Sequence, residues 1–533
     1  MGALWAELKR RRVVRAVLIY LVAGWVVIEV ASTVMPNLNL PEWSATLVTV
    51  LIALGLPLVV ILAWVFDVGP EGIERTDASQ PEQAPVPASQ PRENSTRPTA
   101  AADEQERRSV AVLPFVNMSG DASNEYFSDG ISEEILNLLT KLPQLRVASR
   151  TSSFAFKGKD FDIPTVAEKL GVSTVLEGSV RRAGDHVRIT AQLIDTETDS
   201  HLWSETYDRE LKDVFAIQDD IAHSIVQALK VTLTPKERRS IQYVATSDPK
   251  AFDFYLRGRQ YMYSMVKRDY EHAIRMFEQA IDLDSKYALA YAGIADARSH
   301  LYRYADATPD NAARALDASE KAVTLDPDSA EAHASKGLAL FIGEKYDEAE
   351  AEFERAIELN PNLFESYYYY GLACSSKGDF AKAVEMYREA MEVNPNDYQS
   401  PLFLAQAYSS MGRRQDEMRV RLASLNTIQR HLELNPHDTR ALYCAANNLV
   451  SIGEKEKGRE MAERALGQDE NEPVVLYNVA CFYAMQGNSD RSLELLERAV
   501  EQGWGDRAWL ETDSDLNSLR DNPRFKELLE KVD

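Results

Sequence analysis

The chain has 533 residues, a formal net charge of -24 at pH 7 and only three cysteines. This length exceeds what one ordinary hydrophobic core organises, so we expect several domains. The negative charge argues against a nucleic-acid partner, which requires a basic surface, and the sparse cysteines argue against a disulfide framework.

Two apolar segments near the amino terminus, residues 16–34 and 45–66, are each long enough to cross a bilayer, which takes roughly 20 residues. Five Lys and Arg residues lie within residues 9–15, whereas the loop 35–44 contains none. The positive-inside rule therefore predicts a membrane anchor over residues 1–66, a hairpin of two transmembrane helices. The amino terminus and everything after the second span are expected to face the cytoplasm.

Glu29 is an ionisable residue inside the first predicted span. A charge at membrane depth marks a functional position by default. The alternative is that Glu29 lies close to the outer interface and reaches water, or pairs within an oligomer formed through the hairpin. A cleaved signal peptide is a rival for the first span, but its apolar region is shorter, about 7–15 residues.

Residues 67–108 form the next distinct stretch. They are rich in Pro, Ala, Ser, Gln and Glu, contain no aromatic residue and show no periodicity. A segment of this composition cannot bury enough apolar surface to fold. We therefore expect an extended, disordered linker.

Residues 109–233 alternate between strand-like and helical patterns. The expected elements are strands at 110–115, 145–148, 174–182, 186–194 and 201–207, and helices at 125–142, 163–170 and 214–231. Val187, Ile189 and Ala191 alternate with polar residues, which indicates a sheet with one covered face. The pattern predicts a compact α/β domain with a mixed sheet.

This middle domain also resembles a known family, the TolB amino-terminal-like (FlgO-like) domain of bacterial envelope and signalling proteins. The resemblance is carried by the blocks "AVLPFVNMSGDASNEYFSDGISEEI", "ASRTSSFAFKGK", "VLEGSVRRAGDHVRITAQLID" and "HLWSETYDREL". It implies a bacterial chain, with the hairpin in the inner (cytoplasmic) membrane. Members of this family combine the domain with tetratricopeptide repeats, an adenylate cyclase or a winged-helix DNA-binding domain.

Catalytic and cofactor motifs are missing from the middle domain. Ser152, Ser153, His201 and His223 are residue types that hydrolases use, yet no G-x-S-x-G elbow is present. There is also no phosphate-binding G-x-x-x-x-G-K-[ST] and no Cys or His pair with metal-ligand spacing. We therefore expect no enzyme activity, no cofactor and no metal, and leave a small-ligand pocket in this domain as an alternative.

The carboxy-terminal half repeats with a period of 34 residues. Pro327, Pro361 and Pro395 keep this step, and so do Gly337 and Gly371. Within a unit, apolar residues fall three and four apart, which is the buried stripe of a helix. The small residues allow two helices to cross closely. These units closely resemble the tetratricopeptide repeat.

About seven such repeats are expected over residues 249–500, followed by capping helices over residues 501–533. Stacked repeats form a groove lined by the first helix of each unit, and the resemblance implies protein or peptide partners. The candidate groove residues are Tyr368, Tyr369, Gln399, Phe403, Gln406, Arg440, Tyr443, Asn447 and Asn478. Asn447 and Asn478 stand where carboxylate-clamp members of the family carry asparagines, but the basic residues of that clamp are missing.

The sequence thus predicts a multidomain chain with a two-helix transmembrane hairpin, a small mixed-sheet α/β domain and an all-α tetratricopeptide-repeat solenoid. The expected function is a membrane-tethered scaffold or adaptor that binds peptides or proteins in the solenoid groove, in bacterial signalling or envelope processes. Two alternatives stay open. One is a regulator that senses a ligand through the α/β domain, and the other is an adenylate cyclase-related signalling protein without its catalytic domain.

Overall fold

The computed structural model describes residues 66–69, 72–75, 108–235, 237–238, 245–264, 266–505 and 507–532. The chain divides into two compact units, Met1–Arg97 and Pro98–Asp533. Glu29 and, apart from Phe66, both predicted spans lie outside the described residues. Within the described ranges, no helix is both long enough and apolar enough to cross a membrane.

The first unit contributes a short antiparallel hairpin of β1 (Phe66–Gly69) and β2 (Gly72–Arg75). The expectation of a linker without structure from residue 67 onward is therefore wrong for these residues. Their sequence explains the pairing, because Phe66 and Val68 alternate with other residues and the letters G-P-E-G that follow favour a turn. The remainder of the predicted linker, up to residue 107, is not described.

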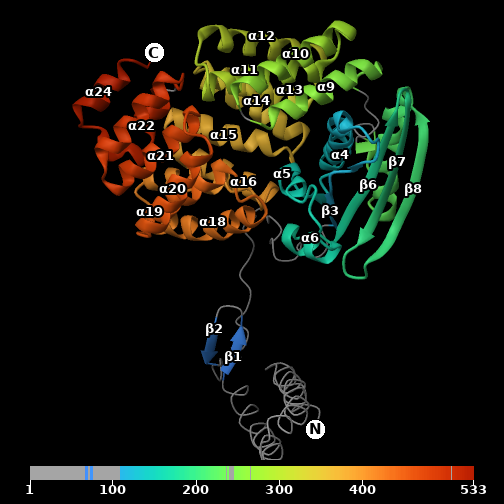
Figure 1. Cartoon of the computed structure of the whole chain (residues 1–533), viewed down its shortest axis with the longest axis horizontal. Helices are drawn as coiled ribbons and strands as arrows, with labels where there is room; N and C mark the ends of the chain where they lie inside the picture. Colours follow the sequence, from blue (N-terminus) through green and yellow to red (C-terminus); the bar gives the residue numbers. More distant parts are fainter. Residues whose placement is uncertain are drawn as a thin grey trace, which may run out of the picture. The chain divides into compact units, whose positions relative to one another are not determined.

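The α/β domain of the second unit is built on a six-stranded sheet (Figure 1). Its strands are β3 (Arg108–Val112), β4 (Val116–Asn117), β5 (Leu145–Val147), β6 (Thr174–Ala183), β7 (His186–Asp195) and β8 (Ser200–Glu210). The strand order is β5-β3-β6-β7-β8, and β4 pairs with β6. Because β3 is parallel to β5 and β6 while β6, β7 and β8 are antiparallel, the predicted mixed sheet is confirmed.

Helices cover both faces of this sheet. They are α4 (Glu125–Thr140), α5 (Arg150–Phe154), α6 (Ile163–Leu170) and α7 (Val214–Ala228). Val110 and Val112 of β3 pack in one buried cluster with α4 and α7, whereas Ala111 packs in another with α6. Successive residues of a strand point to opposite faces, so the two clusters lie on opposite sides of the sheet.

From residue 249 onward the chain is a helical solenoid whose helices follow in consecutive pairs (Figure 1). The pairs are α9 (Pro249–Met262) with α10 (Lys267–Leu283), α11 (Ala288–Tyr304) with α12 (Pro309–Leu325), α13 (Ala330–Ile342) with α14 (Tyr346–Leu359), α15 (Phe364–Lys377) with α16 (Phe380–Val393), α17 (Ser400–Ser410) with α18 (Arg414–Leu434), α19 (Thr439–Ser451) with α20 (Lys455–Gln468) and α21 (Pro473–Gln486) with α22 (Ser489–Glu501). The predicted all-α solenoid is confirmed.

The repeated glycines mark the points where paired helices cross. A Cβ atom added at Gly337 would lie 2.6 Å from the Phe353 ring, and one added at Gly371 would lie 2.5 Å from the Tyr387 ring. Real Cβ atoms do not approach other atoms so closely, and a core at this density does not yield space readily. The 34-residue step of glycine and aromatic ring is therefore a packing requirement, as the sequence indicated.

The solenoid ends in three short elements, α23 (Arg507–Thr512), a 3-10 helix η3 (Ser514–Leu519) and α24 (Pro523–Leu529). Leu516, Leu519 and Phe525 belong to the same buried cluster as α19 and α21. These elements cover the apolar surface that the last repeat would otherwise expose.

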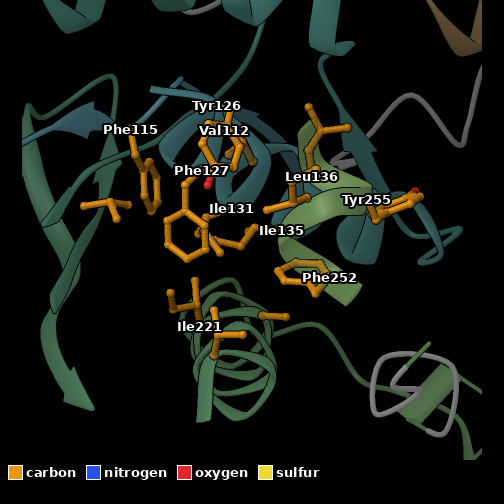
Figure 2. Packing of buried hydrophobic residues seen from close by; sticks show 14 of the residues in the cluster. Val112, Phe115, Tyr126, Phe127, Ile131, Ile135, Leu136, Ile221, Phe252 and Tyr255 are labelled. Atoms are coloured by element: carbon orange, nitrogen blue, oxygen red, sulfur yellow. The ribbon is translucent and has the colours of Figure 1, made fainter. Parts of the chain in front are cut away.

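The first solenoid helix shares a core with the α/β domain (Figure 2). Phe252 and Tyr255 of α9 lie in one buried cluster with Phe127 and Ile131 of α4. Gly130 allows this approach, because a Cβ there would lie 2.7 Å from the Leu256 side chain. The α/β domain is therefore fixed to the start of the solenoid by continuous apolar packing.

Candidate functional site

A chamber of about 620 Å³ lies between the α/β domain and the solenoid. Its roof comes from α4, β5 and α5, and its wall from the first helices of successive pairs, α9, α11, α13 and α15, with further residues as far as Arg440 of α19. Ligand pockets typically measure about 300–1,000 Å³. The chamber is therefore of the size that a small ligand or a short segment occupies.

The roof is latched to the wall through Glu133, a buried residue of α4. Its carboxylate accepts from Arg259 Nη2 of α9 at 2.6 Å and from Arg150 Nε of α5 at 2.8 Å, and it also accepts from the Tyr263 hydroxyl. Burial opposes ionisation, yet Arg259 and Arg150 together lower the pKa of Glu133 to about 2. The latch is thus a charged carboxylate at neutral pH.

A second latch lies about two turns earlier, at the start of α4. The Tyr126 hydroxyl donates to Asp253 Oδ1 of α9 at 2.6 Å, and Arg182 of β6 pairs with the same carboxylate. Arg257 of α9 donates to the Tyr126 hydroxyl at 2.9 Å. Together the two latches fix α4 along the length of α9.

Further contacts join the α/β domain to later repeats. Asn362, just before α15, donates to the carbonyl oxygens of Thr140 at 2.9 Å and Leu142 at 3.2 Å. Lys159 donates to the carbonyl oxygen of Leu434, at the end of α18. The domain therefore bridges from the first repeat to the middle of the solenoid and encloses the chamber between these supports.

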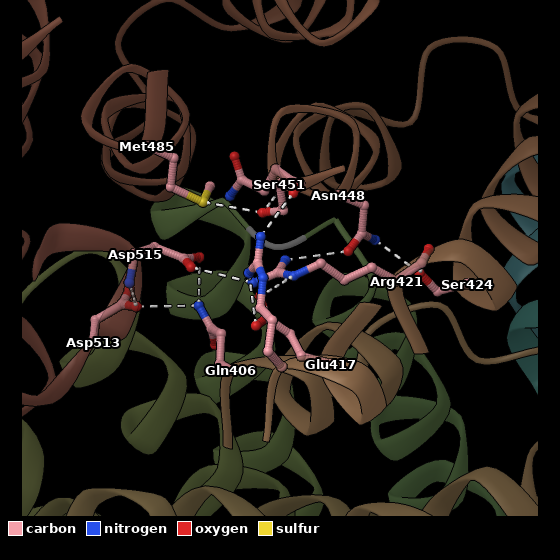
Figure 3. Close-up of polar contacts among 11 residues, drawn as sticks. Gln406, Glu417, Arg421, Ser424, Asn448, Ser451, Met485, Asp513 and Asp515 are labelled. Carbon is pink, nitrogen blue, oxygen red and sulfur yellow. Dashed lines mark hydrogen bonds and ion pairs between the residues drawn. The ribbon is translucent and has the colours of Figure 1, made fainter. Parts of the chain in front are cut away.

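The carboxy-terminal part of the inner wall is covered by the chain's own tail (Figure 3). Gln406 of α17 donates to Asp515 Oδ2 at 2.8 Å and to Asp513 Oδ1 at 3.2 Å. The Tyr477 hydroxyl of α21 donates to Asp513 Oδ2 at 2.6 Å. The Trp509 ring packs edge-on against Phe403, with 5.6 Å between centroids.

A buried ionic network supports this covered part. Arg421 of α18, which is only 1% exposed, pairs with Glu417 Oε1 at 3.0 Å and with Asp515 Oδ1 of η3 at 3.5 Å (Figure 3). Its Nη1 also donates to Asn448 Oδ1 of α19 at 3.3 Å, and Asn448 donates in turn to Ser424. Each charge therefore has a partner supplied by the chain itself.

The structure divides the nine groove residues expected from the sequence. Four of them line the chamber: Tyr368, Tyr369, Gln399 and Arg440. Phe403 and Gln406 contact the tail, and Tyr443 and Asn447 are buried within the wall. Asn478 donates to the Val474 carbonyl of its own helix at 2.8 Å.

The chamber wall carries more negative than positive charge, with nine Asp and Glu side chains against five Lys and Arg. Burial raises the pKa of Glu134 to about 7; Glu133 and Glu331 add to the rise, while Arg259 and Lys141 oppose it. Burial likewise raises the pKa of Asp296 to about 7, with Ser335 and Arg259 opposing and Glu365 adding to the rise. These two carboxylates are therefore costly to ionise at neutral pH.

Aromatic rings and a histidine also line the chamber. His300 Nε2 lies 2.8 Å from the Tyr369 hydroxyl, and the Arg440 guanidinium lies 6.0 Å from the centroid of the Tyr304 ring. Burial lowers the pKa of His300 to about 3, and Arg303, Arg440 and Arg259 lower it further. Arg440 therefore lies near the Tyr304 ring and close enough to the neutral His300 imidazole to affect its pKa.

Three family models match parts of the chain. Residues 308–364 and 352–385 match tetratricopeptide repeat models. The solenoid is built from tetratricopeptide repeats. Residues 105–225 match the model of a HilA/YgeH-like transcriptional regulator, second domain. This description differs from the TolB amino-terminal-like (FlgO-like) resemblance, which stays a prediction.

Relatives and solved structures give similarity over parts of the chain. A putative adenylate cyclase 3 of Rhizobium meliloti (strain 1021) is 43% identical over 244 residues, which are 45% of this chain and 42% of that protein. This chain thus matches less than half of that relative's length. The repeat protein YrrB, described as having an unusual peptide-binding site, is 21% identical and covers 36% of this chain and 96% of its own, with a TM-score of 0.24. A tetratricopeptide repeat protein from Parabacteroides merdae is 14% identical and covers 54% of this chain and 99% of its own, with a TM-score of 0.33.

The tetratricopeptide repeats indicate a scaffold for interaction between proteins. Sequence reasoning placed part of the chamber wall but missed its roof and the acidic residues Glu134, Asp296 and Glu365. One signal was present: Glu133 and Glu134 lie between Ile131 and Ile135, on a helix that buries several of its apolar residues. Charges in such a position require partners from elsewhere in the chain.

Proposed function

We propose that the chain is a membrane-tethered, non-enzymatic scaffold of bacterial signalling whose chamber is a control site. A ligand in the chamber would contact both the α/β domain and the solenoid wall. It would therefore stabilise the arrangement in which the domain is held on the wall relative to any arrangement in which the domain and the wall separate. A protein partner that binds only one arrangement is then recruited or released.

The enclosure of the inner wall is the observation that carries this proposal. The α/β domain covers the wall of the first repeats, and the tail covers Phe403 and Gln406 further along. The space that remains, about 620 Å³, holds a small molecule or a few residues and no folded partner. We therefore combine the two functions that the sequence left as alternatives: the chain senses a ligand and also acts as a scaffold.

Two further points support the proposal. The α/β domain matches part of a transcriptional regulator, and part of the chain is 43% identical to a protein named as a putative adenylate cyclase. Both names belong to proteins with a regulated output. The predicted hairpin over residues 1–66 would raise the effective concentration of a bound partner at the inner membrane.

Crosslinking and mass spectrometry in native bacterial membranes test the proposal. Thr151 lines the chamber and its side chain is exposed, so Thr151→Trp narrows the chamber without disturbing the core. The matched control is Thr206→Trp on β8, outside the chamber. We expect Thr151→Trp to change the yield of crosslinked partner by about tenfold, because the closed state loses a stabilising ligand worth roughly 1.4 kcal/mol or more.

The control must keep the wild-type yield for that result to count. Equal partner yields in wild type, Thr151→Trp and Thr206→Trp would remove the chamber from the control of recruitment. Recovery of the full chain in the soluble fraction would remove the membrane tether.

A further inference from the structure

The chamber carries opposite charges on separate groups of residues. Glu134 of the roof and Asp296 and Glu365 of the wall are acidic residues that line the chamber, and Arg440 of α19 is a basic residue that lines it. The charges of each kind are left without ionic partners inside a cavity of ligand size. The following argument rests on the control site proposed above and concerns what occupies it.

Arg440 is a chamber residue that makes no direct ion pair among the described residues. Its one hydrogen bond runs from Nη1 to Gln399 Oε1 at 2.9 Å, and among the described residues no carboxylate lies within ion-pairing distance of it. Two carboxylates, Asp397 and Glu472, interact with the Arg440 charge from beyond ion-pairing distance. The Asp397 oxygens accept from the backbone N–H groups of Gln399 at 3.0 Å and Ser400 at 2.6 Å. A guanidinium enclosed in this way favours an anion with two oxygens, which its fork of N–H groups can bind.

Neutral donors lie beside Arg440. The Tyr368 hydroxyl donates to the same Gln399 oxygen at 3.4 Å, a long bond that an incoming carboxylate can replace. His300 Nδ1 has no hydrogen-bond partner in the described part of the chain, and His300 lines the chamber. Arg440 thus has polar neighbours that can satisfy the remaining lone pairs of an anion.

The acidic residues of the chamber lack a cation, just as Arg440 lacks an anion. Arg259, the cation next to them, already pairs with Glu133 at 2.6 Å, and Glu133 also holds Arg150. Glu134, Asp296 and Glu365 make no ion pair within the ranges that the structure describes. Lys141 and Arg259 favour the ionised form of Glu134, Ser335 hydrogen-bonds Asp296, and Glu365 is exposed. An ammonium group placed among the three carboxylates would supply the missing charge.

We propose that the chamber binds a short free peptide, with its carboxylate on Arg440 and its amino-terminal ammonium among Asp296, Glu365 and Glu134. A zwitterion supplies an anion for Arg440 and a cation for the carboxylates, whereas a simple anion or cation supplies only one of these partners. The chamber volume of about 620 Å³ favours a peptide of a few residues over a single amino acid, which would leave much of the space empty. Tyrosine side chains along the wall, among them Tyr304 and Tyr369, offer rings and hydroxyls to the peptide between its ends.

Isothermal titration of the full chain in nanodiscs with tetra-alanine tests this assignment. Blocked peptides separate the two ends: N-acetyl-tetra-alanine lacks the ammonium, and tetra-alanine amide lacks the carboxylate. We expect each blocked peptide to bind at least about tenfold more weakly, since a hydrogen bond to a charged group contributes about 1.5–3 kcal/mol. Free alanine reports whether a single amino acid suffices.

Variants assign each end to its residues. The Arg440→Gln variant should bind tetra-alanine and tetra-alanine amide equally tightly. The Asp296→Asn variant should bind tetra-alanine with a smaller advantage over N-acetyl-tetra-alanine than the wild type shows. Arg419→Gln, at a side chain that is 76% exposed on α18, is the matched control and should keep both preferences. Arg440→Lys keeps a positive charge and should restore part of the carboxylate preference; a variant that merely disturbs the fold would not be rescued in this way.

Tetra-alanine that fails to bind, or that binds no better than both blocked forms, overturns the assignment, and so does tight binding of free alanine alone. The outcome is separable from that of the crosslinking experiment. If Thr151→Trp alters partner yield while tetra-alanine does not bind, the control site stands and the peptide assignment fails. If tetra-alanine binds through both ends while Thr151→Trp leaves recruitment unchanged, the peptide assignment stands and the control site fails.

Discussion

The two parts of the solenoid's inner wall differ in how their polar groups are satisfied. Both are lined by the first helices of the same kind of repeat. In the carboxy-terminal part, Arg421 has Glu417, Asp515 and Asn448 as partners, and the tail lies on the wall. In the part that lines the chamber, Arg440 of α19 and, across from the wall, Glu134 of the roof make no ion pair among the described residues.

This difference separates a structural surface from a binding surface within one repeat array. Buried polar groups in folded proteins nearly always find partners, and the exceptions require an explanation. The tail supplies the partners for one part of the wall, so that part is complete without a ligand. The chamber leaves Arg440 and Glu134 without an ion pair among the described residues in a cavity of ligand size, and the proposed peptide would supply their partners.

Arg421→Ala gives the largest effect that we expect in the completed part of the wall. The substitution leaves Glu417, only 2% exposed, and Asp515 buried without their cation. Removing one partner of a buried ion pair costs about 3–5 kcal/mol. Urea unfolding followed by tryptophan fluorescence should show an early transition, because Trp504 and Trp509 report on the tail.

The control for this experiment is Arg419→Ala. Its side chain is 76% exposed and, among the described residues, pairs with Asp416 alone, at 3.5 Å, so we expect a change below about 0.5 kcal/mol. Equal unfolding midpoints for Arg421→Ala and Arg419→Ala would mean that the ionic network does not hold the tail on the wall.

Glu133→Gln should have a smaller effect, and at the other part of the wall. The amide cannot neutralise Arg259 and Arg150, but these side chains are 30% and 19% exposed, so water relieves part of the loss. We expect about 2 kcal/mol of destabilisation, below the range for fully buried pairs. Amide hydrogen exchange should rise in α4 and α9 while the tail elements α23 and η3 keep their protection.

Glu125→Gln provides the comparison for Glu133→Gln. Glu125 pairs with Lys157 at 2.8 Å, but the Glu125 side chain is 38% exposed and the Lys157 side chain is 34% exposed. Such a pair contributes little. Unchanged exchange in α4 and α9 of Glu133→Gln would show that the apolar packing alone holds the roof.

The sequence predicted local structure well where one period controls it. The 34-residue step placed Gly337 against Phe353 and Gly371 against Tyr387, because crossing helices in each repeat depend on residues near in sequence. The mixed sheet followed from alternation in the same way. Such patterns report which face of an element is buried.

The chamber could not be predicted, because it depends on contacts between distant segments. Glu133 and Arg259 are 126 residues apart, and Gln406 and Asp515 are 109 apart. Periodicity assigns Gln399 and Gln406 to the same inner face but does not show that a roof leaves one open and a tail covers the other. Membrane anchoring by the hairpin remains a prediction.

Glu134→Gln should give the smallest effect, and its pH dependence distinguishes an open charge from a satisfied one. The folded-state pKa of Glu134 is about 7, above the usual value of 4.5, with burial as the main cause and with Glu133, Glu331, Arg259 and Lys141 facing it. A raised carboxyl pKa contributes stability below pH 4.5, and this contribution is lost as the pH rises toward 7. Glutamine has no proton to lose, so Glu134→Gln should gain thermal stability relative to wild type between pH 5 and pH 8.

We expect a relative gain of about 1–2 °C, because solvent in the chamber reduces the cost of the anion. Scanning calorimetry of the full chain at pH 5, 6, 7 and 8 measures it, and Glu197→Gln on an exposed turn should follow the wild-type profile. Tetra-alanine should cancel the difference at pH 8, since its ammonium would neutralise the carboxylate that glutamine replaces. A gain that shrinks as the pH rises would mean that Glu134 already has its partner, and the two parts of the wall would then no longer differ.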